Sequence, residues 1–441
     1  MSTVISIDEI HTTAAEPRWS LASRIGFRFA FVFFGLLCLS TQVFGGLISI
    51  PNVDLPDPAT LPPLKQIVEW TAAHIFRIAK PLVETGSGSG DKTFDWVLSF
   101  CLLVIAAIAA CIWTFLDRKR GDHETLHKWF RVFLRFSLGS QMLSYGMVKL
   151  FPMQMSFPGL HQLLEPYGQF SPMGVLWSSI GASPGYERLC GSAEVVAGLL
   201  LLTPGLTMLG ALICAAVTLQ IFILNMTYDV PVKLFSFQLL LMSLFLLVPE
   251  FSRLAKFLVM NRAVGPSVQP RLFRSSRANR IAIGVQILFG AWLLGTTLYS
   301  TWRDWFKYGG GAPKSQLYGI WNVDQLSIDG HTRSPLLNDY GRWRRVIFDY
   351  PNRMSYERMD DSFGGYDVSI KVEDQTIEFT KSDDKNWKGH IHYQRSAPDH
   401  MTLDGSLGGH PMQMQLRLMD RNGIQLVSRG FHWVQEYPYN R

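Results

Sequence analysis

The segment FRVFLRFSLGSQMLSYGMVKLF, residues 130–151, decides the fold class. It has the roughly 20 residues that a helix needs to cross the hydrocarbon core of a bilayer. Within it, Ser137, Gln141, Tyr145 and Lys149 recur at every fourth position and therefore share one face of a helix. Lipid offers these groups no hydrogen bonds, so we expect them to face protein or a ligand. For Lys149, near the outer end of the helix, a second interpretation stays open, in which its ammonium extends to the membrane interface. We therefore predict a membrane helix that packs inside a bundle.

The composition supports several such helices. The 441-residue chain is 48% hydrophobic and only 17% charged, and other apolar runs also reach spanning length. Residues 302–441 contain 18 Lys+Arg and 18 Asp+Glu, so the net charge of +6 lies in the rest of the chain. Positive charge of this kind suits loops beside anionic lipid. No basic cluster with interleaved aromatic residues indicates nucleic acid as a partner.

We predict an α-helical bundle of about seven spans. They cover approximately residues 25–49, 95–116, 129–151, 186–204, 206–226, 231–250 and 280–300. Lys and Arg collect before the first span (Arg18 and Arg24), between the second and third, and between the sixth and seventh. These places share one side of a membrane if the N-terminus is cytoplasmic. We therefore expect a multi-pass protein of the bacterial inner membrane, without a cleavable signal, whose residues 302–441 are periplasmic or extracellular.

Two loops on the outer side have patterns of their own. Residues 64–83, LKQIVEWTAAHIFRIAKPLV, place apolar residues at helical spacing and predict an amphipathic helix at the membrane interface. The flexible linker ETGSGSGDKT follows. Residues 152–185 contain five prolines, so we expect short pieces that cap the outer mouth of the bundle.

In the tail, apolar residues recur at every second position. Met412, Met414, Leu416 and Leu418 alternate with polar residues, and similar runs are separated by turn sequences such as DYPN, SAPD and DRNG. This pattern is typical of a β-meander. Eight or nine strands are expected, which is enough for a small closed barrel or a sandwich.

The sequences YGMVKLF and CGSAEVVAGLLLLTPGLTMLGAL resemble the DoxX-like family of small membrane proteins. Gly146 and Lys149 match the family's Gly-x-x-Lys element, and Glu194 and Gly198 match the Glu that precedes its Gly-Leu-Leu-Leu run. Some members are subunits of quinone-reducing sulfur oxidoreductases, and others lie in membrane oxidoreductase complexes. The resemblance therefore implies a four-helix core, a quinone ligand and an oxidoreductase partner. It gives the following division of the chain: residues 1–127 (N-terminal segment, two spans and amphipathic helix), 128–251 (DoxX-like core), 252–301 (basic loop and seventh span) and 302–441 (exported β domain).

The tail also resembles lipocalin-type barrels. It opens with QLYGIWNV, which places Gly319-x-Trp321 at the start of the first strand, and it ends with VSRGFHWVQEYPYNR. In such barrels an early Trp closes one end and an Arg of the last strand stacks on it. The resemblance implies that Trp321 and Arg429 form this pair.

Two carboxylates on the following span could interact with the polar face of residues 130–151. Glu187 and Glu194 share a helical face, and Glu194 is too deep to reach water easily. We expect Lys149 nearest Glu187, and Tyr145 or Gln141 nearest Glu194. Two interpretations stay open: a structural ion pair or protonated carboxyl within the bundle, or a proton-exchanging group of a quinone or lipid site.

A second polar group lies in the sequence NMTYDVPVKLFSF. Tyr228, Asp229 and Lys233 either extend the same polar cluster or form a capped turn with their charges in water. Arg135 is expected to reach the inner lipid headgroups.

The sequence contains no complete catalytic or metal-binding set. His123 and His127 have the spacing of paired metal ligands, but no third ligand is near, and a solvated helix start is the preferred interpretation. We therefore assign no catalytic residue and no metal, and no cofactor is evident except a quinone.

Two functional hypotheses follow. The first is a redox-associated membrane component that binds quinone or a similar isoprenoid near the outer leaflet, with Lys149 and Glu194 at its headgroup. The alternative is a non-enzymatic module for binding or transport of a lipid or small molecule, in which the lipocalin-like domain captures the ligand. A barrel interior filled with Trp and Met would argue against capture, whereas an apolar cavity would support it.

Overall fold

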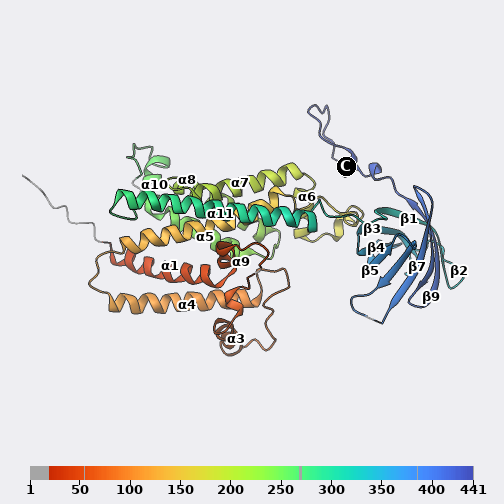
Figure 1. Cartoon of the computed structure of the whole chain (residues 1–441), viewed down its shortest axis with the longest axis horizontal. Coiled ribbons are helices and arrows are strands. Elements are labelled where there is room, and N and C mark those ends of the chain that lie inside the picture. Colours follow the sequence, from red (N-terminus) through yellow and green to blue (C-terminus); the bar gives the residue numbers. More distant parts are fainter. Residues whose placement is uncertain (1–18, 54, 268–270, 385, 441) are drawn as a thin grey trace, which may run out of the picture. The chain divides into compact units, whose positions relative to one another are not determined.

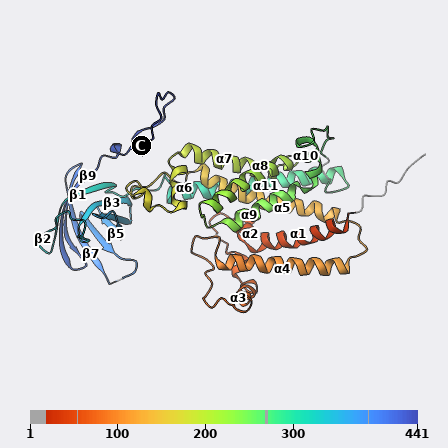
Figure 2. The ribbon, with the colours of Figure 1, turned by 180° about the vertical axis from the view of Figure 1, so that it is seen from behind.

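The computed structural model describes residues 19–53, 55–267, 271–384 and 386–440. These residues form two compact units, a helical unit (Met1–Gly146 and Ala193–Tyr299) and a barrel unit (Met147–Ser192 and Ser300–Arg441). Figures 1 and 2 show the helices and the barrel from opposite sides. The N-terminal residues 1–18, including Arg18, lie outside the described residues.

A helix is present at each of the seven predicted spans. The helices of the chain are α1 Leu21–Ser40, α2 Gln42–Ile48, α3 Leu64–His74, α4 Thr93–Leu116, α5 Glu124–Leu150, α6 Pro172–Gly181, α7 Pro184–Leu202, α8 Thr207–Thr227, α9 Lys233–Leu247, α10 Phe251–Leu258, α11 Ser276–Tyr308 and α12 Gln425–Ser428. Short 3₁₀ turns occur at η1 Pro58–Thr60, η2 Tyr167–Gln169, η3 Val248–Glu250 and η4 Arg421–Gly423.

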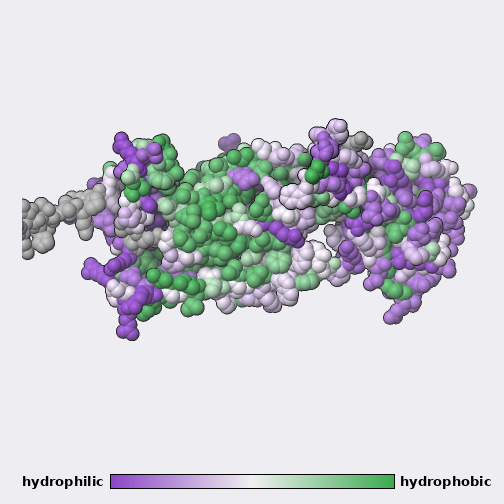
Figure 3. All heavy atoms as spheres, turned by 90° about the horizontal axis from the view of Figure 1, so that it is seen from above, coloured by the Kyte–Doolittle hydropathy of each residue, from purple (hydrophilic) through white to green (hydrophobic). Residues whose placement is uncertain are grey.

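Five helices of the described residues are long and apolar enough to cross a membrane. They are α1, α4, α8, α9 with its continuation into α10, and α11. The face shown in Figure 3 carries a broad hydrophobic band over the helical unit. Helices α5 and α7 are less apolar because they carry charged residues such as Arg135, Lys149 and Glu194. A multi-pass membrane protein follows from these helices, and the count of seven spans stays a prediction.

The helical unit is held together by apolar packing and by close helix contacts. Helix α1 packs beside α4, and α8 beside α9. The amphipathic helix that we predicted over residues 64–83 is present but shorter, because α3 ends at His74. It buries Val68 and Ala72 in the core that it shares with α4. Helices α5 and α7 approach closely at two glycines, since a Cβ on Gly198 would lie 3.1 Å from the carbonyl oxygen of Gly139. Such small residues let helices in membranes pack backbone against backbone.

The tail forms a closed barrel, one of the two architectures that the strand pattern predicted. Its strands are β1 Gly319–Ile328, β2 His331–Thr332, β3 Trp343–Tyr350, β4 Arg353–Arg358, β5 Phe363–Lys371, β6 Thr376–Thr380, β7 Lys388–Ala397, β8 His400–Leu407 and β9 His410–Leu418. They pair in the order β2-β1-β3-β4-β5-β6-β7-β8-β9, and antiparallel pairing of β1 with β9 closes the cylinder. In β9 the alternating residues Met412, Met414 and Leu416 are buried. The alternation therefore predicted correctly which residues of this strand face the barrel interior.

Large side chains fill the inside of the barrel. Trp321 is 0% exposed, and Phe348, Phe379, Met354 and Met401 are buried in the same cluster. The Trp343 ring stacks on Tyr356 with centroids 4.1 Å apart.

The expected contact of Trp321 with Arg429 is wrong. The last strand ends at Leu418, and Arg429 follows α12, where its guanidinium lies 4.0 Å from the ring centroid of Tyr439. The arginine over Trp321 is Arg395 of β7, at 5.2 Å from the ring centroid. The Trp321 indole donates a hydrogen bond to the carbonyl oxygen of Leu317 (3.0 Å). An arginine does face the tryptophan, but it comes from a middle strand.

The loop between α5 and α7 packs on the outer surface of the barrel. Leu160 is buried against Ile320 and Ile347, which point outward from β1 and β3. Its backbone N–H donates to the Asp349 carboxylate (2.9 Å). Gly159 permits this approach, because a Cβ there would lie 2.8 Å from the same carboxylate. The whole proline-rich segment, residues 152–185, thus belongs to the barrel unit.

Candidate functional site

A polar cavity of about 330 Å³ lies inside the helical unit beside Tyr145, and we call it the Tyr145 pocket. Its walls come from the junction of α1 and α2, the η1 turn, the linker before α4, and the first turns of α4 and α9. The lining residues are Ser40, Thr41, Gln42, Asp57, Ala59, Thr60, Glu84, Gly88, Ser89, Gly90, Lys92, Phe94, Asp95, Leu98, Ser99, Tyr145, Val232, Leu234, Phe235 and Gln238. A volume of this order suits a small ring or a headgroup.

Tyr145 and Gln141 contact α2. The Gln42 side-chain amide donates to the Tyr145 hydroxyl oxygen (2.8 Å). The Gln141 amide lies against Gly46, where any Cβ would collide with it. These contacts add α2 as a neighbour of the polar face, while the side of α5 that carries Gly139 packs on Gly198 of α7. The expectation that Tyr145 or Gln141 lies nearest Glu194 of α7 stays a prediction.

Glu194 is 1% exposed and lies in the helical unit. It is close enough to interact electrostatically with Tyr145 and with Cys214 of α8. Tyr145, which we predicted to lie near Glu194, is thus close enough to interact with the Glu194 charge. A carboxyl buried to this degree is stable only when its surroundings supply partners or a proton.

Lys149 and Glu187 are both buried in the barrel unit. They interact electrostatically, as the sequence predicted. In addition, one Glu187 carboxylate oxygen accepts a hydrogen bond from the backbone N–H of Met155 (2.9 Å). Glu187 therefore fixes the start of the loop that reaches the barrel, which favours the structural interpretation for this pair.

Tyr228, Asp229 and Lys233 lie at the turn between α8 and α9. The Lys233 ammonium pairs with the exposed Asp229 carboxylate at 2.8 Å. The backbone N–H groups of Lys233 and Leu234 donate to the Asp91 carboxylate (2.8 and 2.9 Å). Asp91 thus caps α9 at its positively polarised end. This arrangement corresponds to the capped turn that we kept open. Asp91 lies in the predicted linker, and no local pattern distinguishes it as a cap of α9.

Charged residues that sequence reasoning missed border the Tyr145 pocket. Lys92 pairs with Asp95 at 2.9 Å, and Lys65 pairs with Glu84 of the pocket wall at 2.8 Å. Burial raises the pKa of Asp57, against an opposing effect of Lys92 and with a further increase from Asp95. Asp57 therefore holds a proton at a higher pH than an exposed aspartate does.

His123 is buried, so the solvated helix start that we preferred is wrong. The Arg28 Nε–H donates to His123 Nε2 (3.0 Å), and the other end of the guanidinium donates to the Asp117 carbonyl oxygen (3.0 Å). Burial lowers the pKa of His123, and the positive charges of Arg28 and Arg120 lower it further. The imidazole is thus a neutral acceptor within an aromatic cluster that includes Trp113. The partner of His123 is 95 residues away in sequence and could not be read from local spacing.

Comparison with known proteins gives one relative and no assigned activity. No family model matches the chain, and no solved structure matches it. The chain is 28% identical over 138 residues to the uncharacterized protein YwoB of Bacillus subtilis (strain 168). The match covers 29% of this chain and 79% of YwoB.

Proposed function

We propose that this protein is a DoxX-like component of the bacterial inner membrane that binds a quinone or a similar isoprenoid in the Tyr145 pocket. The observation that carries the proposal is the pocket itself, which combines an apolar side (Phe94, Leu98 and Phe235) with hydrogen-bonding groups. A quinone ring needs this combination, because its faces are apolar and its carbonyl oxygens accept hydrogen bonds. Tyr145 is oriented by Gln42, which fixes the phenol at the pocket wall.

The surrounding carboxyl groups support a redox-associated role. A quinone takes up protons when it is reduced, so its site needs groups that exchange protons near neutral pH. Asp57 lines the pocket and has a raised pKa. Glu194 is buried within electrostatic reach of Tyr145. In this proposal Asp57 and Glu194 exchange protons, Tyr145 binds the headgroup, and electrons come from a membrane oxidoreductase partner.

Quinone binding can be tested directly on the purified protein. Lipid extracts should contain a quinone, and a short-chain benzoquinone should bind in equilibrium dialysis. Tyr145→Phe should weaken this binding about fivefold through loss of one hydrogen-bonding group. The matched control is Tyr299→Phe, because Tyr299 is exposed on α11 and does not line the pocket. Extracts without quinone, together with equal binding by wild type and Tyr145→Phe, would exclude the proposal.

The membrane orientation is part of the proposal. The clusters of Lys and Arg support a cytoplasmic N-terminus and a barrel on the periplasmic or extracellular side. A reporter fused after residue 301 should be active only outside the cytoplasm. Activity inside the cytoplasm would show that a span has been miscounted or that the N-terminus is not cytoplasmic.

The alternative, ligand capture by the barrel, has less support. Trp321, Phe348 and the buried methionines occupy the barrel interior. An interior filled in this way resembles a folded core more than a binding cavity. We therefore place the proposed ligand in the helical unit.

A further inference from the structure

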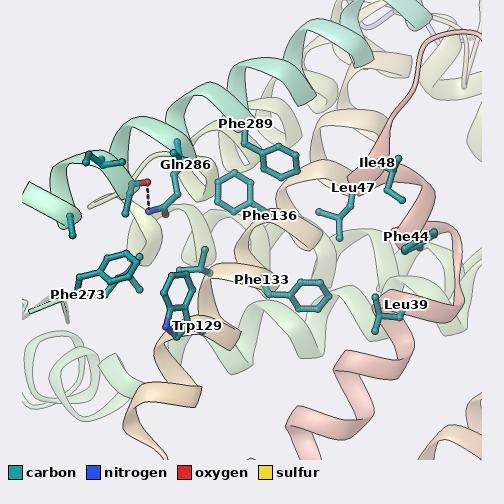
Figure 4. A pocket seen from close by; sticks show the side chains of 16 residues that line it. Leu39, Phe44, Leu47, Ile48, Trp129, Phe133, Phe136, Phe273, Gln286 and Phe289 are labelled. Atoms are coloured by element: carbon teal, nitrogen blue, oxygen red, sulfur yellow. Dashed lines mark hydrogen bonds between the residues drawn. The ribbon is translucent and has the colours of Figure 1, made fainter.

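A second, larger hollow in the helical unit runs between α5 and α11, and we call it the α5–α11 groove. Its volume is about 950 Å³, and α1 and α2 close one end. Figure 4 shows Trp129, Phe133 and Phe136 on α5, Gln286 and Phe289 on α11, and Leu39, Phe44, Leu47 and Ile48 at the far end. Gln286 is the one polar side chain among its described lining residues.

The groove follows from the spacing of residues on the two helices. Trp129, Val132, Phe133 and Phe136 lie on one face of α5, at intervals of three and four. On α11, Ala278 and Ala282 occupy the corresponding face, and their small side chains leave the space unfilled. From residue 278 to residue 289 the groove extends about 16 Å along α11, at 1.5 Å per residue. This length fits most of an acyl chain.

Gln286 supplies a polar point in an otherwise apolar surface. Its side chain is 9% exposed, and its Nε2–H donates to the Ala282 carbonyl oxygen of the same helix (3.1 Å). Its Oε1 has no hydrogen-bond partner within the described residues. A buried acceptor without a donor lowers the stability of the fold, so this oxygen is suited to accept a hydrogen bond from a ligand hydroxyl.

A basic cavity adjoins the groove at Gln286, and we call it the Arg135 pocket. It measures about 380 Å³ and shares Val132, Leu272, Ala282 and Gln286 with the groove. Four cationic side chains and no carboxylate are among its described lining residues, and the cations are Lys128, Arg131, Arg135 and Arg271.

Arg135 is the buried cation of this cavity, with 7% of its surface exposed. Its Nε–H donates to the Leu201 carbonyl oxygen (2.9 Å) at the C-terminal end of α7. The charged neighbour that acts on it is Arg131, which is another cation. Arg135 therefore does not extend to lipid headgroups outside the bundle, as the sequence suggested, but stays at the cavity wall. Guanidinium groups in this setting favour a phosphate.

We propose that the Arg135 pocket and the α5–α11 groove together bind one anionic phospholipid with a hydroxyl-bearing headgroup, such as phosphatidylglycerol. The phosphate lies among the four cations, a headgroup hydroxyl donates to Gln286 Oε1, and one acyl chain lies along the groove. Lys128 also pairs with Glu124 (3.8 Å), whereas the charged neighbour of Arg135 is the cation Arg131. A neutral quinone headgroup would not supply Arg135 with a counter-charge, so this site is separate from the Tyr145 pocket. The lipid fits because the polar and apolar parts of the site meet at Gln286.

The test uses the delipidated full-length protein in detergent and native mass spectrometry. Phosphatidylglycerol and phosphatidylcholine with identical chains are titrated separately. One phosphatidylglycerol should bind about tenfold more tightly than phosphatidylcholine, and Arg135→Gln should remove that preference. The control is Arg118→Gln, because Arg118 is exposed and contacts Phe115 instead of the cavity. Equal affinity of the wild type for both lipids, or an equal loss in Arg118→Gln, would overturn the proposal.

Two further variants keep the test valid if Arg135→Gln does not fold. Lys128→Gln removes a cation of the same cavity from a partly exposed position and should reduce the preference about threefold. Ala282→Phe fills the groove at its junction with the cavity and should weaken binding of both lipids at that site about tenfold. Unchanged phosphatidylglycerol binding in both variants would also overturn the proposal.

Discussion

The barrel and the helical unit bury polar and apolar residues under different rules. In β9, Met412, Met414 and Leu416 enter the core simply because every second residue faces inward. In α5, Gln141 and Tyr145 share a face, but its contacts with Gln42 and Gly46 of α2 could not be predicted from the spacing. The alternation in a strand predicts which side chains face the core. The polar face of a helix predicts only which side of that helix packs against protein. The neighbour in that direction depends on the rest of the bundle.

The largest effect should come from emptying the centre of the barrel. Trp321→Ala removes a fully buried ring and should cost about 4 kcal/mol of unfolding free energy. Thermal melting followed by near-UV circular dichroism should show an early transition of the barrel while the helical signal at 222 nm persists. The matched control is Trp433→Ala, because Trp433 is 91% exposed. A single shifted transition for both signals would show that the two regions unfold together.

Lys149→Leu should have the next largest effect. Loss of the ammonium removes one of the cations that act on the buried Glu187 carboxylate, Arg188 being another, and should cost about 3 kcal/mol. The double variant Lys149→Leu/Glu187→Leu should be more stable than the sum of the single losses predicts. Additive losses in a detergent thermal-stability series would show that the two residues are not coupled. Glu194→Leu should cost less, since apolar packing can replace a deep carboxyl.

Leu160→Ala tests whether the loop supports the barrel. It removes a buried side chain from Ile320 and Ile347 and should cost about 2 kcal/mol. For the same reason, residues 315–441 expressed alone should be β-rich, but they should expose those two isoleucines. Ile347→Thr should then improve the solubility of that fragment, which ultracentrifugation can measure. A fragment that is monomeric without the substitution would show that the loop is dispensable.

Tyr145→Phe should have the smallest effect on stability. It removes the oxygen that accepts the Gln42 hydrogen bond and should cost about 1 kcal/mol. Gln42→Leu should cost a similar amount, and the double variant should cost less than the sum of the two. Thermal melts of the three proteins in detergent measure this coupling. Strictly additive effects would mean that the pair does not orient the phenol.

The sequence predicted the fold better than the site, and particular residues show why. Strand alternation marked the barrel, and apolar runs marked the helices, because both signals are local. Tyr145 was selected because it is polar within an apolar helix. Asp57 and Asp91 are acidic residues in loops, where acids are ordinary, so only their distant partners distinguish them. His123 was misjudged for the same reason, since its burial depends on Arg28 of another helix.

The loop on the barrel has a mechanical consequence. It is held at Met155 by the Glu187 carboxylate and at Leu160 by the Asp349 carboxylate. Five residues of fully extended chain reach at most about 17 Å. The first turn of α7 and strand β3 are therefore connected through this short segment of the loop, in addition to the chain that enters the barrel from α11. Loss of either carboxylate, at Glu187 or at Asp349, would therefore release one end of this five-residue segment and let it move away from the barrel surface.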